Sequence, residues 1–275
     1  MARQDTVHLF GRFNKANILN DESMAVIYMD CVRGKRFVED HTDKSKMKDR
    51  IAVVTKTPEL IAKVEKFEKN DIVMVKGTLS TTVATGTAHC EHCGELHSFE
   101  QLTITVTPID LFFVKREESD EEAMLDLYNH REFSNEILVT GEIRHKPRGY
   151  KTDRGLIICE YQMNIDRKFH VLTDDPAKRS DAPIVKSYGD VALDNLLRLD
   201  AGSTVLIDGF IQSRKFPKTF KCSECGEYFT VPRYTLEIVP YAVEYLKNYR
   251  EDKDFDDVEA ERQKIYDSVT EENNG

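Results

Sequence analysis

An internal repeat divides this chain into two copies of one pattern. The segment Asp71-Ile-Val-Met-Val-Lys-Gly77 recurs as Ser203-Thr-Val-Leu-Ile-Asp-Gly209, at an offset of 132 residues. The same offset relates Cys90-x-x-Cys93-Gly94 to Cys222-x-x-Cys225-Gly226. A repeat of this length indicates a duplicated domain, because solenoid units recur every 20 to 50 residues or so, by a rough rule. The length of 275 residues also suits two domains, which we place at 1–117 and 133–250.

The apolar patterns predict the same order of elements in both copies, with five strands and one helix between the third and the fourth. In the first copy Thr57 can cap the predicted helix and Pro58 lies in its first turn, a pairing typical of a helix start. The predicted strands cover 7–13, 24–32, 51–55, 72–80 and 102–106, then 137–143, 156–165, 184–186, 205–212 and 234–239. This order is typical of the OB-fold, a small Greek-key barrel. We therefore predict a mainly β protein with two tandem OB-fold barrels.

The acidic residues concentrate in two segments. The chain has a net charge of -10, of which 116–132 carries -5 and 251–275 carries -7, so the remainder carries +2. Acidic blocks of this kind are commonly solvated linkers or interaction tails. We predict an acidic linker at 118–132 and an acidic C-terminal tail at 251–275, around bodies that are close to neutral.

Several segments resemble the bacterial single-stranded DNA-binding proteins. The first strand ends in Leu9-Phe10-Gly11-Arg12, and the second copy carries a helix, turn and strand from Leu193 to Arg214 with a closing strand from Arg233 to Val239. The resemblance implies a protein that coats single-stranded DNA without strong sequence preference, in replication, recombination or transfer. It also implies a homodimer, because the family usually assembles four barrels.

Three features depart from that family. The chain has no tryptophan for base stacking, and it ends in Glu271-Glu-Asn-Asn-Gly275 rather than in an apolar tip. The C-x-x-C-G sequences in the hairpins are also not a standard family feature. Recruitment of replication or recombination proteins by the tail is thus only an expectation.

Binding of single strands requires cations for phosphates and flat side chains for bases. The second hairpin interleaves both kinds of residue, whereas its counterpart at 81–101 has no lysine or arginine. The predicted contacts are Arg12, Arg33, Lys35, Arg36, Phe37, Lys48, Arg50, Tyr161, Arg167, Lys168, Phe169, Tyr188, Arg214, Lys215, Phe216, Lys218, Phe220, Lys221 and Arg233. For any one of them, a place in the core or on an ordinary wet face is the competing interpretation.

The paired cysteines predict a metal site. Two C-x-x-C knuckles supply the four thiolates of a zinc ribbon, and each copy holds one knuckle. One hypothesis is a zinc ion shared by Cys90, Cys93, Cys222 and Cys225, within a chain or between chains. A second is a local site of Cys90, Cys93 and His97 with His89 or His92, and a third is reduced thiols without metal.

The sequence is compatible with other functions. An RNA-binding OB-fold protein and a protein-interaction scaffold built on the same barrels fit the sequence as well. We find no phosphate-cradling glycine loop, nucleophile elbow or metal-carboxylate cluster, so we do not expect an enzyme. No apolar run approaches the roughly 18 residues of a membrane span, and no signal segment is evident, so a cytoplasmic protein is expected.

Overall fold

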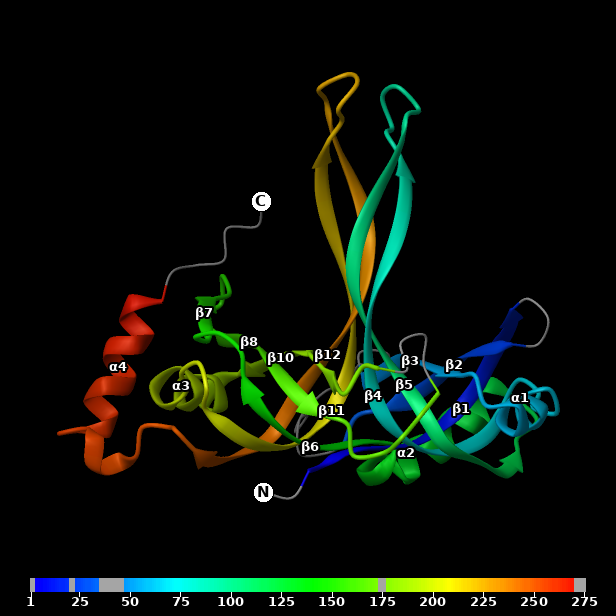
Figure 1. Ribbon diagram of the computed structural model, residues 1–275, viewed down its shortest axis with the longest axis horizontal. Helices are drawn as coiled ribbons and strands as arrows, with labels where there is room; N and C mark the ends of the chain where they lie inside the picture. The colour runs from blue at the N-terminus through cyan, green and yellow to red at the C-terminus, as the bar shows by residue number, and fades with distance from the viewer. Residues whose placement is uncertain (1–2, 20–22, 35–46, 173–176, 270–275) are drawn as a thin grey trace.

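A computed structural model describes residues 3–19, 23–34, 47–172 and 177–269. The protein is mainly β, and long antiparallel strands account for most of its ordered length (Figure 1). The elements of the first half are β1 (Asp5–Leu19), β2 (Met24–Val32), β3 (Lys48–Thr55), α1 (Pro58–Val64), β4 (Asp71–His89), β5 (Leu96–Arg116), α2 (Asp120–Asn129) and η3 (Arg131–Phe133). Those of the second half are β6 (Asn135–Ile143), β7 (Arg148–Lys151), β8 (Ile157–Asp166), β9 (Ser180–Asp181), β10 (Ile184–Tyr188), α3 (Gly189–Arg198), β11 (Thr204–Lys221), β12 (Tyr228–Lys247), η4 (Asp252–Asp254) and α4 (Val258–Ser268).

Five strands of each half close on themselves in the same order. In the first half the ring of pairings runs β1-β2-β3-β5-β4 and returns to β1, with β3 and β5 parallel. In the second half it runs β6-β8-β10-β12-β11 and returns to β6, with β10 and β12 parallel. Inward side chains alternate with outward ones, as in β2, where Ala25, Ile27 and Met29 are buried. The strand order is that of the predicted OB-fold.

Strands β1 and β6 join the two barrels into one sheet. They pair antiparallel, with Val7 opposite Ile137, Asp5 opposite Val139 and Leu9 opposite Asn135. The two strands are counterparts at an offset of 130, which relates Gly11 to Gly141. Val7 therefore lies opposite its own counterpart, and a pseudo-two-fold axis passes through this pair.

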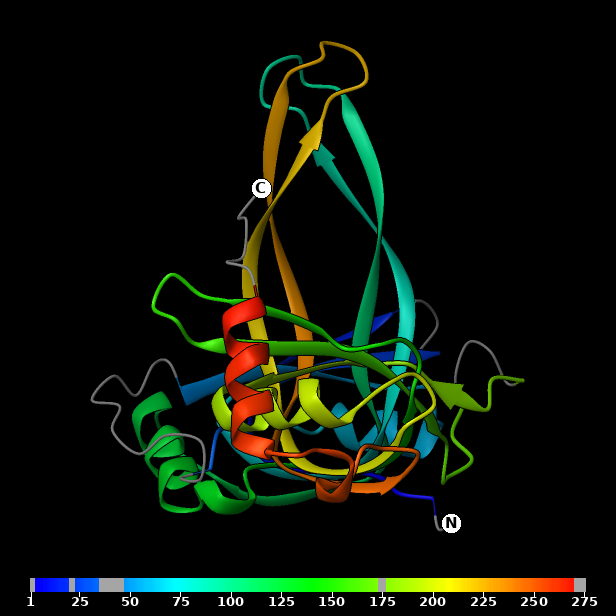
Figure 2. The same ribbon diagram turned by 90° about the vertical axis from the view of Figure 1, so that its left-hand side faces the viewer.

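Two long hairpins rise from the same side of the joined barrels and converge at their tips (Figures 1 and 2). One is formed by β4 and β5, the other by β11 and β12, and both are paired along their whole length. The sequence predicted that the first strands of these hairpins end near Ser80 and Gln212, but they continue to His89 and Lys221. Beyond the barrel the residues are mostly polar and lie at least partly exposed, so they lack the regular apolar pattern from which strands are predicted.

Both acidic segments contain helices that pack against the barrels. Ala123 and Leu127 of α2 are buried against Phe10, Val32 and Ile72, so the segment 118–132 is more than a solvated spacer. Helix α4 contacts α3, where Arg262 pairs with Asp194 at 3.1 Å. Within the described residues, no helix is both long and apolar enough to cross a membrane.

Candidate nucleic-acid interface and metal centre

The base of the second hairpin is anchored on the first barrel by a buried carboxylate. Asp49 of β3 accepts hydrogen bonds from the Ser213 amide at 2.8 Å and hydroxyl at 3.2 Å. It also accepts two from the Arg33 guanidinium, at 2.7 and 2.9 Å. Burial raises the pKa of Asp49 above its ordinary value, although the bonds from Arg33 and Ser213 act in the opposite direction. The Arg33 side chain is thus engaged within the fold.

The base of the first hairpin is anchored on the second barrel in the same way. Asp181 of β9 accepts hydrogen bonds from the Thr81 amide at 2.7 Å and hydroxyl at 3.0 Å, and from Arg167 at 2.6 Å. Burial would raise the pKa of Asp181, but hydrogen bonds from Arg167 and Lys178 hold it below its ordinary value. Thr81 and Ser213 are 132 residues apart, so the two anchors are counterparts. Each hairpin therefore depends on the opposite barrel for its position.

A groove that we call the basic groove lies where the second hairpin meets the first barrel. It has a volume of about 550 Å³, and β2 and β3 form one wall and β11 and β12 the other. Four cations and two tyrosines line it, over a floor that includes Ala52, Ile104 and Leu236; these six are Tyr28, Lys48, Arg50, Arg214, Lys215 and Tyr234. Tyr234 is 68% exposed, so a face of its ring is open to a ligand.

Buried acids beneath the basic groove orient its cations. Burial would raise the pKa of Asp30, but hydrogen bonds from Arg50 and Arg12, with the nearby Lys48, hold it below its ordinary value. The ionised Asp30 bonds the Arg50 Nε at 2.9 Å. Arg214 lies 3.7 Å from the buried Glu237. The groove thus presents the guanidinium groups of Arg50 and Arg214, held by buried carboxylates, beside the ammonium groups of Lys48 and Lys215.

The pseudo-symmetric counterpart, which we call the threonine groove, differs in chemistry. It lies between the first hairpin and the second barrel and has a volume of about 400 Å³. Three cations, Lys56, Arg167 and Lys178, line it, but the described part of its lining contains no aromatic ring. Its other residues carry mostly hydroxyl or apolar side chains and include Thr81, Thr82, Val83, Leu102, Thr105, Thr107 and Leu172. The two hairpins are therefore unequal at their bases, in line with their different sequences.

The second hairpin has an exposed outer face and an inner face that packs against the first hairpin. On the outer face Lys215 is paired across the strands with Tyr234, and Lys221 with Tyr228, and all four are exposed. On the inner face Phe220 stacks on Phe99 of the first hairpin, with ring centroids 5.1 Å apart. Arg233 lies 4.0 Å from the same Phe99 ring and is 5% exposed.

The remaining predicted contacts are distributed over several places. Arg12 is 4% exposed and pairs with Asp30 and Asp120, while Tyr161 is 4% exposed and lies on the inward side of β8 with Cys159 and Met163. Because both side chains are buried, neither can contact a base. The prediction that Arg12 and Tyr161 bind the strand is therefore wrong. Lys168 and Phe169 lie in the loop after β8, Tyr188 donates a hydrogen bond to Glu237, and Arg214 lies over Phe216. Lys218 is exposed, and Lys35, Arg36 and Phe37 lie outside the described residues.

Two tyrosines of the basic groove, Tyr28 and Tyr234, were not among the predicted contacts, although Tyr234 is one of the aromatic residues that the second hairpin interleaves with cations. Tyr28 lies between the inward residues Ile27 and Met29 of β2, so the alternation of the strand directs it outward. Tyr234 occupies an outward position on β12, opposite Lys215. The alternation of residues along each strand shows that both rings point outward. That they line one groove depends on the second hairpin lying against the first barrel.

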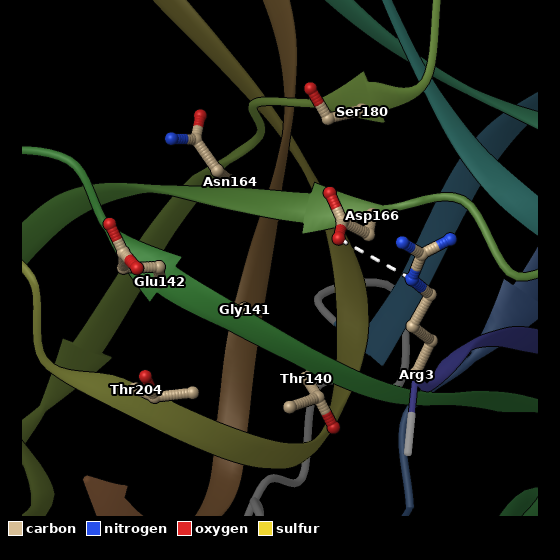
Figure 3. Close-up of a pocket in the computed structure, with 8 residues that line it drawn as sticks. All are labelled: Arg3, Thr140, Gly141, Glu142, Asn164, Asp166, Ser180 and Thr204. Atoms are coloured by element: carbon tan, nitrogen blue, oxygen red, sulfur yellow. Dashed lines mark ion pairs between the residues drawn. The ribbon is translucent and has the colours of Figure 1, made fainter. Parts of the chain in front are cut away.

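A polar pocket of about 540 Å³ lies where β6 and β8 diverge (Figure 3). Its walls carry the carboxylates of Glu142 and Asp166, and Arg3 pairs with Asp166 at 3.4 Å. Carboxylates repel phosphates, so this pocket is unsuited to a nucleic-acid backbone.

The four paired cysteines meet at the hairpin tips, in a cluster that we call the cysteine centre. Their sulfur atoms all lie within 4.8 Å of one another. Cys93 and Cys222 are 3.6 Å apart, and Cys90 and Cys225 are 3.8 Å apart. A disulfide requires about 2.05 Å, whereas tetrahedral zinc with bonds of about 2.3 Å requires sulfur atoms about 3.8 Å apart. The spacing fits a shared metal site within one chain.

Both knuckles have the backbone geometry that such a site needs. Gly94 and Gly226 each have φ of +77°, a conformation that favours glycine, and each donates its amide to the carbonyl of the first cysteine, at 2.9 and 3.1 Å. Backbone hydrogen bonds from Cys225 and Glu224 lower the pKa of Cys222 to about 6. A thiolate is therefore favoured at Cys222 at neutral pH. Although the backbone bond from Glu95 lowers the pKa of Cys93, burial and the neighbouring thiols raise it to about 12.

Histidine positions favour the shared site over the local one. His97 Nε2 lies 3.2 Å from the Sγ of Cys222, which belongs to the other hairpin. His89 bonds the Gly94 carbonyl at 3.0 Å, and His92 bonds the Tyr228 carbonyl at 3.3 Å. Beneath the sulfur atoms, Phe229 packs with Phe220, Ala88 and Val231.

Comparison with solved structures shows a similar fold. The wild-type single-stranded DNA-binding protein from Thermus aquaticus has a TM-score of 0.55 and 13% identity, over 91% of this chain and 97% of that one. A deletion mutant of the same protein gives 0.53 and 14%, over 92% and 100%. No protein-family model and no curated protein matches the sequence. At this identity the similarity establishes the fold alone.

Proposed function

We propose that this protein binds single-stranded DNA in the basic groove and coats it without strong sequence preference. The observation that carries the proposal is the meeting of four cations and two outward tyrosines, from both halves of the chain, around one groove. Cations neutralise phosphates and rings stack on any base, so neither kind of contact selects a sequence. The Thermus aquaticus protein with the similar fold is itself a single-stranded DNA-binding protein, which supports the same assignment.

In this proposal the groove binds the strand and catalyses no reaction on it. A strand that lies between Tyr28 and Tyr234 can place phosphates near Lys48 and Lys215, which are fixed to separate barrels. The exposed Lys221 and Tyr228 extend this surface along the outer face of the second hairpin. We infer a use in replication, recombination or transfer, where unpaired strands need protection.

A salt titration with oligo(dT) tests the proposal. The double variant Lys48→Ala, Lys215→Ala should lower the slope of log affinity against log salt by about 1.4, since each phosphate contact contributes about 0.7. Tyr234→Ala should weaken binding about 5- to 150-fold, the effect of one lost base stack. Lys146→Ala, an exposed lysine outside the groove, serves as the matched control. A wild-type protein without salt-sensitive binding would favour a protein-interaction scaffold, and matched RNA oligomers decide between DNA and RNA.

We also propose that the cysteine centre holds one zinc ion, with Cys90, Cys93, Cys222 and Cys225 as ligands. A bound zinc would supply four metal-thiolate bonds between two hairpins that pack on each other mainly through Phe99, Phe220 and Arg233. The metal would then be structural, holding the second hairpin against the first. Two chains are further proposed to form a homodimer, which light scattering would test.

A further inference from the structure

A pocket of about 520 Å³ lies at the end of the first barrel, away from the basic groove, and we call it the α1 pocket. Three cations and three aromatic rings line it together with Leu111, and none of the described carboxylates does; the six are Lys63, Lys66, Phe67, Phe112, Phe113 and Arg116. Phe112 is 47% and Phe113 54% exposed. Exposed rings on this scale, rimmed by charge, are typical of an interaction surface.

The second half shows what covers the corresponding surface there. Phe113 pairs with Val73 and Tyr245 with Val205, so Phe113 and Tyr245 occupy the same place at an offset of 132. Over Tyr245 lies the ring of Tyr249, at 5.6 Å. Arg198, the counterpart of Lys66, lies 5.7 Å from the Tyr245 ring.

The covering segment is acidic and carries aromatic side chains. Arg198 pairs with Asp252 at 2.6 Å and donates to the Arg250 carbonyl at 3.3 Å. Phe255 follows, with its ring 4.1 Å from the Arg250 guanidinium. Residues 249–257 thus fold back onto the end of α3, with five carboxylates in nine residues available to meet its cation.

In the first half the chain leaves this place uncovered. After β5 it turns into α2, which packs on Phe10 and Val32 at another part of the barrel. Lys63 pairs with Asp110, and Arg116 with Asp71 and Glu68. Among the described residues Lys66 has no ion pair, so its ammonium group is available to an incoming carboxylate.

We propose that the α1 pocket docks an acidic, aromatic-containing peptide segment of a partner protein. The rings of Phe112 and Phe113 would receive the aromatic side chain, and Lys66 would pair with a carboxylate, as Tyr245 and Arg198 do within the second half. The chain's own acidic segment is held on the second barrel, so a separate protein is the fitting occupant. The proposal concerns a surface outside the basic groove and is independent of the proposed function.

The test uses a fluorescein-labelled peptide with the sequence of residues 249–257 as the probe, and anisotropy with the full-length protein as the readout. We expect saturable binding that Lys66→Glu and Phe113→Ala each weaken by about fivefold or more. Both side chains are exposed, so thermal unfolding of the variants should match the wild type. Lys146→Glu should bind the peptide as the wild type does, and a peptide with alanine for Tyr249 and Phe255 should bind weakly.

Three results would overturn the proposal. The first is no binding at peptide concentrations up to about 1 mM, which corresponds to about -4 kcal/mol. The second is equal binding by the Lys66, Phe113 and Lys146 variants. The third is displacement of the peptide by oligo(dT), which would place the α1 pocket within the nucleic-acid surface. Oligo(dT) affinity, measured separately on the same proteins, shows whether the proposed function stands.

Discussion

The carboxyl group of Asp5 offers a sharp test of the pseudo-symmetry. Asp5 is fully buried at the start of β1, where it accepts hydrogen bonds from the Leu79 amide at 3.0 Å and from the Thr78 hydroxyl. Its counterpart in the second half is Asn135, which accepts from the Ile211 amide at 3.0 Å and donates to the Ile211 carbonyl at 2.8 Å. The same position thus tolerates an uncharged amide.

Burial raises the pKa of Asp5 from 3.8 to about 6. The folded protein therefore holds this proton more tightly than the unfolded chain does, and the resulting stabilisation is complete below about pH 4 and lost as pH rises through about 6. At neutral pH the ionised Asp5 costs the fold about 3 kcal/mol, since each pKa unit corresponds to about 1.36 kcal/mol. Asn at position 5 has no such cost, and its amide can donate to the Thr78 hydroxyl oxygen.

We therefore expect Asp5→Asn to raise the free energy of unfolding by up to about 3 kcal/mol near pH 7.5 and by less than about 1 kcal/mol near pH 4. Urea unfolding at the two pH values measures the difference. The reciprocal variant, Asn135→Asp, is the matched control and should lose stability at neutral pH, because it buries a carboxylate and removes the donor to Ile211. A gain from Asp5→Asn that is the same at both pH values would refute the reasoning.

Two further predictions concern the hairpins. Asp49→Ala and Asp181→Ala should each destabilise the protein by about 3 kcal/mol in urea unfolding, because each removes the carboxylate that pairs with a largely buried arginine. Only Asp49→Ala should also weaken oligo(dT) binding markedly, since Asp49 anchors the hairpin that carries half of the basic groove; equal losses would count against that assignment. Elemental analysis should find one zinc per chain, lost in both Cys90→Ser and Cys225→Ser, whereas metal retained by either variant would contradict a shared centre.

Most of the fold could be predicted because its signals are local. The apolar pattern gave β2 with the bounds Met24 and Val32 that the structure has, and the helix at Leu60, Ile61 and Val64 buries the face that its spacing indicates. The helices of the acidic segments were missed, because charge patterning predicts solvation and only a few apolar residues, such as Leu127, reach a core. The helix α4 has no buried residue.

The candidate site was harder to predict because it depends on contacts between distant residues. Arg33 and Arg167 are of the residue type that contacts phosphates, but each donates hydrogen bonds to a buried aspartate within the fold. Tyr28 and Tyr234 are separated by more than 200 residues and come together only because a hairpin crosses to the opposite barrel. The cluster of Cys90, Cys93, Cys222 and Cys225 was one of the predicted arrangements, since C-x-x-C spacing is local. The sequence left open whether the four cysteines met within a chain or between chains, formed a local site with histidines, or held no metal.

The crossing of the hairpins also ties their lengths together. Nine residues lead from the Thr81 anchor to Cys90, and nine from the Ser213 anchor to Cys222. Two residues inserted into each strand of one hairpin would lengthen that hairpin by about 6.6 Å. This length exceeds the 4.8 Å within which all four sulfur atoms lie. Such a hairpin would overshoot its neighbour, and only a matching insertion in the other would let the thiols meet again. The length of one hairpin can thus change without separating the cysteines only if the other hairpin changes by the same number of residues.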